Sequence, residues 1–115
     1  MNVSLLVDAQ GIVPSSGSLT LQLAPSGHGV VWSADTVEVI CSSAMSESTC
    51  TLYLGNAPIQ ANYLDETATG STGDVSSKIS GRPIRLGTVL YGVWNGADIG
   101  ATCTMTVVGS QEVTA

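Results

Sequence analysis

The sequence predicts an all-β fold, a small antiparallel β-sandwich of about seven to eight short strands in an Ig-like or jelly-roll-like arrangement. Three observations lead to this prediction. Apolar and polar residues alternate with a period of two in several segments, which places one set on each face of a sheet. Turn-forming residues interrupt these segments about every 10 residues. No segment has the 3.6-residue period of an amphipathic helix. A small closed β-barrel is the alternative architecture.

The clearest element is the stretch from residue 86 to residue 109, which we expect to form a β-hairpin. Apolar side chains alternate along its first arm, residues 89–94, and Cys103, Met105 and Val107 alternate with threonines along its second arm. The connecting residues 95–100 contain Asn-Gly and a second Gly, which supply the positive φ angles of a chain reversal. The inner face of this hairpin is expected to carry much of the core.

Earlier strands are expected at residues 3–7, 18–24, 36–41, 49–54 and 59–64. The sequence PSGHG at residues 25–29 is the strongest break in the chain. The polar run SSAMSES at residues 42–48 predicts a second hairpin over residues 36–54. Residues 65–77 lack an apolar rhythm and are expected to form an exposed loop, after which Ile79, Ile84 and Leu86 bring the chain back to the core.

Length and charge limit the number of domains and the kinds of partner that the chain can have. Its 115 residues predict a single domain over residues 1–115. The net charge of −6 argues against a nucleic-acid partner, because tracking phosphates needs a dense set of Lys and Arg. The amino terminus has no basic region followed by a long apolar run, and no apolar run approaches the length of a membrane span. We therefore expect synthesis in a cytoplasm and no membrane partner.

The three cysteines, Cys41, Cys50 and Cys103, each continue an alternating apolar row. This pattern is typical of small buried hydrophobic residues. A bridge between Cys41 and Cys50 is the alternative, although an odd count and a cytosolic origin argue against it. One histidine, His28, and no Cys-x-x-Cys pair leave zinc without a ligand set, so we expect no metal and no cofactor.

Carboxylates and hydroxyls offer no convincing catalytic pattern. Asp65, Glu66 and Asp74 fall in the expected loop, where a solvated role is simpler than acid–base catalysis or calcium binding. His28 has no Gly-x-Ser-x-Gly partner motif, and we expect it to be a loop residue. These observations predict a protein that is not an enzyme.

Two sets of residues are candidates for contacts with partners. All basic side chains, Lys78, Arg82 and Arg85, lie in the segment KISGRPIR at residues 78–85. This segment is either the blunted edge of a sheet or a docking patch for an acidic surface, including that of a neighbouring copy. Trp94 and Trp32 are candidate contact or lid aromatics, with core packing as the alternative role.

Three segments together resemble a known group of proteins. They are TLYLGNAP at residues 51–58, the Thr/Gly/Ser/Asp-rich ETATGSTGD at residues 66–74, and IRLGTVLYGVWNGADIGATCTMTVVG at residues 84–109. In this order they resemble small virion structural proteins of tailed phages that infect actinobacteria. The resemblance implies a non-enzymatic minor tail or tail-tip protein, localised in the virion after synthesis in the host cytoplasm. Its partners would be other virion proteins and further copies of itself.

Two alternatives stay open at this point. The protein could instead be a decoration protein on the capsid, because the physical demands on a small sandwich are the same there. A carbohydrate-binding or host-adhesion module is the alternative from another class, and it requires an exposed indole at Trp32 or Trp94 to stack on a sugar ring.

Overall fold

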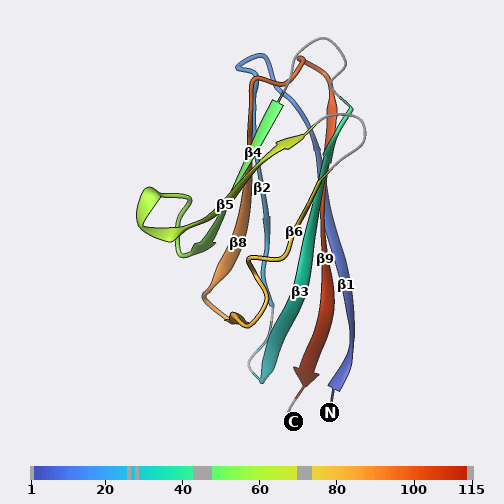
Figure 1. Ribbon diagram of the computed structural model, residues 1–115, viewed down its shortest axis with the longest axis vertical. Coiled ribbons are helices and arrows are strands. Elements are labelled where there is room, and N and C mark those ends of the chain that lie inside the picture. The colour runs from blue at the N-terminus through green and yellow to red at the C-terminus, as the bar shows by residue number, and fades with distance from the viewer. Residues whose placement is uncertain (1, 26, 28, 43–47, 70–73, 114–115) are drawn as a thin grey trace.

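Two antiparallel β-sheets packed face to face make up the structure, a computed structural model that describes residues 2–25, 27, 29–42, 48–69 and 74–113 (Figure 1). The five-stranded sheet contains, in spatial order, β1 (Asn2–Ile12), β9 (Thr102–Val113), β3 (Val30–Cys41) and β6 (Asp74–Ser76), with β7 (Pro83–Arg85) also paired to β3. The four-stranded sheet contains β2 (Ser18–Leu23), β8 (Val89–Asn95), β4 (Ser48–Gly55) and β5 (Tyr63–Thr69). The predicted sandwich is confirmed, and the ladders form two separate sheets instead of a closed barrel.

The strand pairing is that of a jelly roll. β1 pairs with β9, β2 with β8, β3 with β6 and β4 with β5, all antiparallel, so each pair lies inside the previous one along the chain. Such nesting describes a long two-stranded ribbon that is rolled up, with its tip at the turn between β4 and β5. Ladders between β3 and β9 and between β4 and β8 join neighbouring turns of the roll. The Ig-like alternative is thereby set aside.

Both predicted hairpins are wrong in their pairing, although their strands are present. β8 lies in the four-stranded sheet and β9 in the five-stranded sheet, and β3 and β4 are separated in the same way. The residues after β8 therefore cross from one sheet to the other. The expected glycine conformations are found there, with φ of 77° at Gly96 and 86° at Gly100. A two-residue period indicates a strand but does not indicate which sheet the strand joins. Two strands in one sheet and two strands in opposite sheets therefore have the same sequence pattern.

Several predicted boundaries need correction. β1 runs to Ile12, well past the expected end at residue 7. The strand expected at residues 59–64 begins at Tyr63, after the short 3₁₀ helix η1 (Gln60–Asn62). Residues 65–69 belong to β5 and residues 74–76 to β6, so most of the expected loop is sheet. His28, residues 43–47 of the SSAMSES reversal and residues 70–73 lie outside the described residues.

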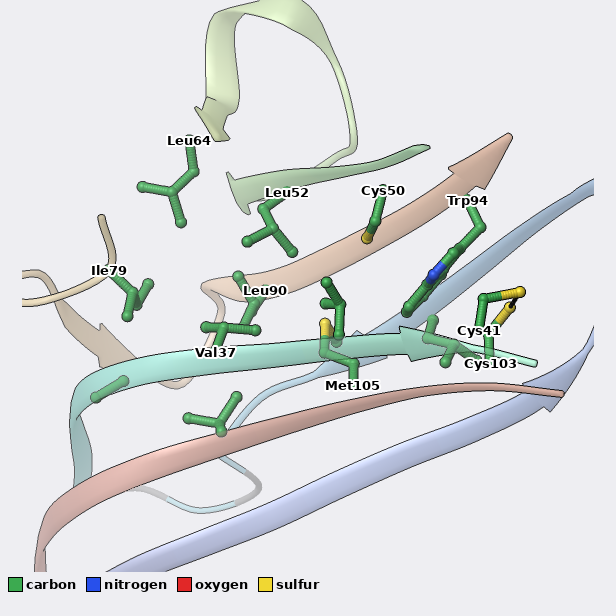
Figure 2. Packing of buried hydrophobic residues seen from close by; sticks show 14 of the residues in the cluster. Val37, Cys41, Cys50, Leu52, Leu64, Ile79, Leu90, Trp94, Cys103 and Met105 are labelled. Carbon is green, nitrogen blue, oxygen red and sulfur yellow. Dashed lines mark hydrogen bonds between the residues drawn. The ribbon is translucent and has the colours of Figure 1, made fainter. Parts of the chain in front are cut away.

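The core lies between the two sheets, and Figure 2 shows side chains from both of them meeting there. Cys103, Met105 and Val107 of β9 are fully buried, as their alternation predicted. From the opposite sheet, Leu52 and Trp94 are also fully buried. The five-stranded sheet thus presents thiols, a thioether and branched chains to an indole and leucines.

Gly109 has a packing role that no larger residue could fill. β3 contains a register shift between Ala34 and Thr36, opposite Gly109 and Val108 of β9. A Cβ atom at Gly109 would lie 2.7 Å from the Cα of Ala34 and 2.9 Å from the amide nitrogen of Asp35, and it would collide with the carbonyl oxygen of Ser33. These neighbours are backbone atoms of the β3–β9 ladder, and they cannot shift without breaking its hydrogen bonds.

We expect Gly109→Ala to lower the free energy of unfolding by about 1–3 kcal/mol, because overpacking against backbone forces the β3–β9 ladder apart. Urea denaturation measures the change. The control is Ser110→Ala on the exposed face of the same strand, which should shift stability by no more than about 0.5 kcal/mol. Equal stability of the two variants would contradict the close approach.

Candidate functional site

The two tryptophans lie in the core and not on the surface. Trp94 is 0% exposed and Trp32 is 6% exposed. The indole nitrogen of Trp94 has no hydrogen-bond partner among the described residues. Burying this N–H group without a partner costs free energy, so the ring contributes to the core through its large apolar surface. The prediction that Trp94 or Trp32 is a surface contact residue is therefore wrong. Both side chains lie on the inner faces of their strands and pack in the core between the two sheets.

The basic side chains Lys78, Arg82 and Arg85 are all exposed, and they project from a segment that is held firmly. Ile79 and Ile84 are fully buried and anchor the segment to the core. The amide of Arg82 donates to the carbonyl of Ile79 at 3.0 Å, and the amide of Thr88 donates to the carbonyl of Arg85 at 2.9 Å. Lys78 and Arg82 thus lie at a hydrogen-bonded turn, and Arg85 lies on strand β7.

Strand β7 has the features of a protected sheet edge. It is three residues long and pairs with β3 only through residues 31–33, and Pro83 removes one amide donor. Arg85 also helps to line a depression of about 560 Å³ at the start of β3, with Val30, Val31 and Glu112 among its walls. The segment therefore has the features of a protected edge, and its three basic side chains are exposed.

The opposite edge of the five-stranded sheet is β1, and it lacks these protective features. β1 is 11 residues long, and no strand in the described part of the chain pairs with its outer side (Figure 1). It contains no proline, lysine or arginine, and Asp8 is its only charged residue. Leu6 is 72% exposed and Ile12 is 65% exposed. A long, open and weakly charged edge is a template for a further strand.

The ladder shows which backbone groups of β1 face outwards. In an antiparallel ladder a residue directs its N–H and C=O towards the same neighbour, alternating along the strand. The amide of Ser42 donates to the carbonyl of Thr102, so Thr102 faces β3 and Cys103 faces β1. Cys103 is the partner of Gly11, which places odd-numbered residues of β1 on the β9 side. The amides and carbonyls of the even-numbered residues, Ser4, Leu6, Asp8 and Gln10, consequently point to the open side.

The outer face of the sheet beside this edge carries methyl and hydroxyl groups and few charges. In β1 and β9 the outward side chains form cross-strand pairs: Leu6 with Val108, Asp8 with Thr106, Gln10 with Thr104 and Ile12 with Thr102. Val108 is exposed, and the three threonines are partly exposed. This face and the β1 edge are continuous, and we call them together the β1 surface. The sequence does not reveal this surface, because only the strand order shows that β1 has a neighbour on one side alone.

Asp65 and Asp74, from the segment expected to be a loop, both lie on strands and accept hydrogen bonds. Asp65 belongs to β5 and accepts a hydrogen bond of 2.6 Å from the hydroxyl of Ser76 on β6, which ties the two sheets together on the side away from β1. Asp65 and Asp74 also accept hydrogen bonds from the next amide in the chain. Within the described residues, no three His, Cys, Asp or Glu side chains gather closely enough to hold a metal ion.

All three cysteines are free and fully buried, as expected for small hydrophobic residues. Burial raises the pKa of the Cys50 thiol to about 12, so this sulfur is a poor nucleophile at neutral pH. Cys41 contacts Cys103 and not the Cys50 considered from sequence, because Cys50 lies on β4 in the opposite sheet.

A scan of protein-family models finds no match to this chain, and neither does a search of curated proteins. Among the described residues no helix is long and apolar enough to cross a membrane. Function therefore has to be inferred from the residues and their placement.

Proposed function

We propose that this protein is a non-enzymatic structural component of a tailed-phage virion, assembled in several copies at the tail or tail tip. The observation that carries the proposal is the β1 surface, an 11-residue open edge beside a weakly charged sheet face. A free monomer gains nothing from such an edge and risks aggregation. A protein built into a larger assembly uses it for pairing.

Strand addition along β1 would combine two sources of binding energy. The outward amides and carbonyls of residues 4, 6, 8 and 10 would form main-chain hydrogen bonds with the added strand. Leu6 and Ile12, both largely exposed, would lose apolar surface to the partner. Alternating side chains would set the register of the added strand.

The two edges of the five-stranded sheet differ, and this difference favours neighbouring copies in a head-to-tail arrangement. β1 is long and has one acidic side chain, whereas the opposite edge has the short strands β6 and β7 and all three cations of the chain. A contact between unlike surfaces repeats around a ring or along a filament. Because the net charge is acidic, the cationic segment has a complementary surface on a neighbouring copy.

The fold alone does not distinguish a virion role from others, whereas the resemblance in sequence points to virion proteins. Jelly rolls occur in viral capsid domains but also in lectins and cupins, so the fold by itself does not select a function. The resemblance to small actinobacteriophage virion proteins rests on residues 51–58, 66–74 and 84–109, which include parts of β4 and β5 and the stretch from β7 to β9. A carbohydrate-binding or adhesion module is less well supported, because the exposed indole that it requires is absent: Trp32 and Trp94 are both buried.

Locating the protein in particles of a phage that encodes it tests this proposal. We expect mass spectrometry of purified particles to detect the protein and immunogold labelling to place it on the tail or its tip. Labelling spread over the head would replace the tail assignment with that of a capsid decoration protein. Absence of the protein from purified particles would overturn the virion role.

The same particles test the β1 surface through a matched pair of variants. Leu6→Lys adds a charge to the open edge and should reduce incorporation by roughly tenfold or more, since it removes buried apolar area and places a charge in the contact. Ile59→Lys makes the same kind of change at an exposed residue before η1, away from β1, and should be incorporated normally. Equal incorporation of both variants would rule out the β1 surface as the contact.

Joint replacement of the exposed arginines, Arg82→Ala with Arg85→Ala, should weaken assembly at low salt and have less effect at high salt, because an exposed ionic contact is screened. The melting temperature should change little, since neither side chain is buried. The control, Arg82→Lys with Arg85→Lys, keeps the charge and should assemble at nearly the normal level. Normal incorporation of the alanine variant would show that the cations only blunt the edge.

A further inference from the structure

The Cys41 and Cys103 side chains meet at one end of the core. Cys41 is the last residue of β3 and Cys103 is the second residue of β9, and the two are direct partners in the β3–β9 ladder. Their sulfur atoms are 3.1 Å apart, and both side chains are fully buried (Figure 2). No backbone rearrangement is needed to bring these sulfurs into contact.

The position of the pair within the ladder is the one that suits a cross-strand bridge. The amide of Ser42 donates to the carbonyl of Thr102 at 2.9 Å, and these two residues flank Cys41 and Cys103. Cys41 and Cys103 are therefore a non-hydrogen-bonded pair, in which the Cα atoms are about 4.5 Å apart and the side chains approach most closely. This separation lies within the range that disulfides span, roughly 4.4–6.8 Å between Cα atoms.

We propose that Cys41 and Cys103 form a cross-strand disulfide when the protein meets an oxidising environment, with a low-molecular-weight disulfide as the oxidant. This inference does not depend on the proposed virion role. In a reducing environment the pair stays as two thiols, whereas an oxidising environment favours the disulfide. The bond would convert the contact between β3 and β9 into a covalent link.

The reaction proceeds by two thiol–disulfide exchanges. The thiolate of one cysteine attacks a sulfur of the small disulfide, forms a mixed disulfide and releases the first small thiol. The second cysteine, as its thiolate, then attacks the protein-bound sulfur of that mixed disulfide and releases the second small thiol. The protein loses two electrons and two protons, and the oxidant is reduced to two thiols.

Burial controls the rate of this reaction but does not prevent it. Burial raises the pKa of the Cys103 thiol, and the contact with Cys41 raises it further, so little thiolate is present in the closed structure at neutral pH. The pair lies where β3 ends and β9 begins, and the ends of strands open more readily than their centres. We therefore expect slow oxidation of the folded protein and faster oxidation during refolding, with both rates rising with pH.

Cys50 is excluded from the bridge by its place in the fold. It lies on β4 as the register partner of Trp94, in the sheet opposite Cys41 and Cys103. Figure 2 shows the Trp94 ring between Cys50 and the other two sulfurs. The third thiol should therefore survive oxidation, and it provides a matched control.

Refolding the full chain from urea with glutathione disulfide, and in parallel with dithiothreitol, tests the inference. After removal of the oxidant, thiol titration in denaturant should fall from three to one per chain, and the intact mass should fall by two hydrogen atoms. The Cys50→Ala variant should lose both of its thiols, whereas Cys103→Ala should not form an intramolecular bridge. Three titratable thiols in the oxidised wild-type chain, or a bridge that includes Cys50, would overturn the proposal.

Thermal unfolding provides a second readout on the wild-type chain alone, which avoids any failure of a variant to fold. The bridge closes a loop that contains every strand from β4 to β8, so the oxidised form should melt roughly 10 °C or more above the reduced form. A lower melting temperature for the oxidised form would show that the bond distorts the ladder, which would contradict the proposed fit.

Discussion

Strand β9 is the element on which the rest of the structure depends. It lies between β1 and β3 and pairs with both along nearly its whole length, so it joins the beginning of the chain to its middle. On its inner face Cys103, Met105 and Val107 are buried against the four-stranded sheet, and Gly109 lets the backbone of β3 approach closely. Because these partners are far apart in sequence, the roll forms only when distant segments meet, and slow folding is expected.

The same arrangement explains why the two edges of the five-stranded sheet differ. A closed barrel would have no edges, whereas a jelly roll leaves them at both sides of each sheet. On one side β6 and β7 are short, Pro83 lacks an amide N–H that could pair with a further strand, and charged residues lie close to Pro83 in the sequence. On the other side β1 continues for 11 residues with no such protection. The asymmetry has a simple explanation if the β1 surface is covered by a neighbour in an assembly.

Alternation in the sequence was enough to predict the fold class and much of the core. The inward rows of β2 and β9, such as Leu21 and Met105, follow directly from the two-residue period. Pairing could not be predicted in this way, because the period is the same whether two strands share a sheet or face each other. The expected hairpin over residues 86–109 failed for that reason, and its glycines turned out to form a crossing between sheets.

The candidate site was only partly accessible from the sequence. The exposed cluster of Lys78, Arg82 and Arg85 could be predicted, since long charged side chains are rarely buried. Trp94 could not be assigned to the core or the surface, because its exposure depends on which sheet faces it. The β1 edge was missed because being an edge is a property of the whole topology, and no local pattern in residues 2–12 reveals that β1 has a neighbour on one side only.

Amide hydrogen exchange of β1, measured in the free protein and in assembled particles, tests the central claim most directly. In the free protein the outward amides of residues 4, 6, 8 and 10 face solvent and should exchange rapidly, while the amides bonded to β9 should be protected. We expect the outward amides to become protected in particles, because a partner strand would pair with them. Unchanged rapid exchange of these amides in particles that contain the protein would contradict assembly through the β1 surface.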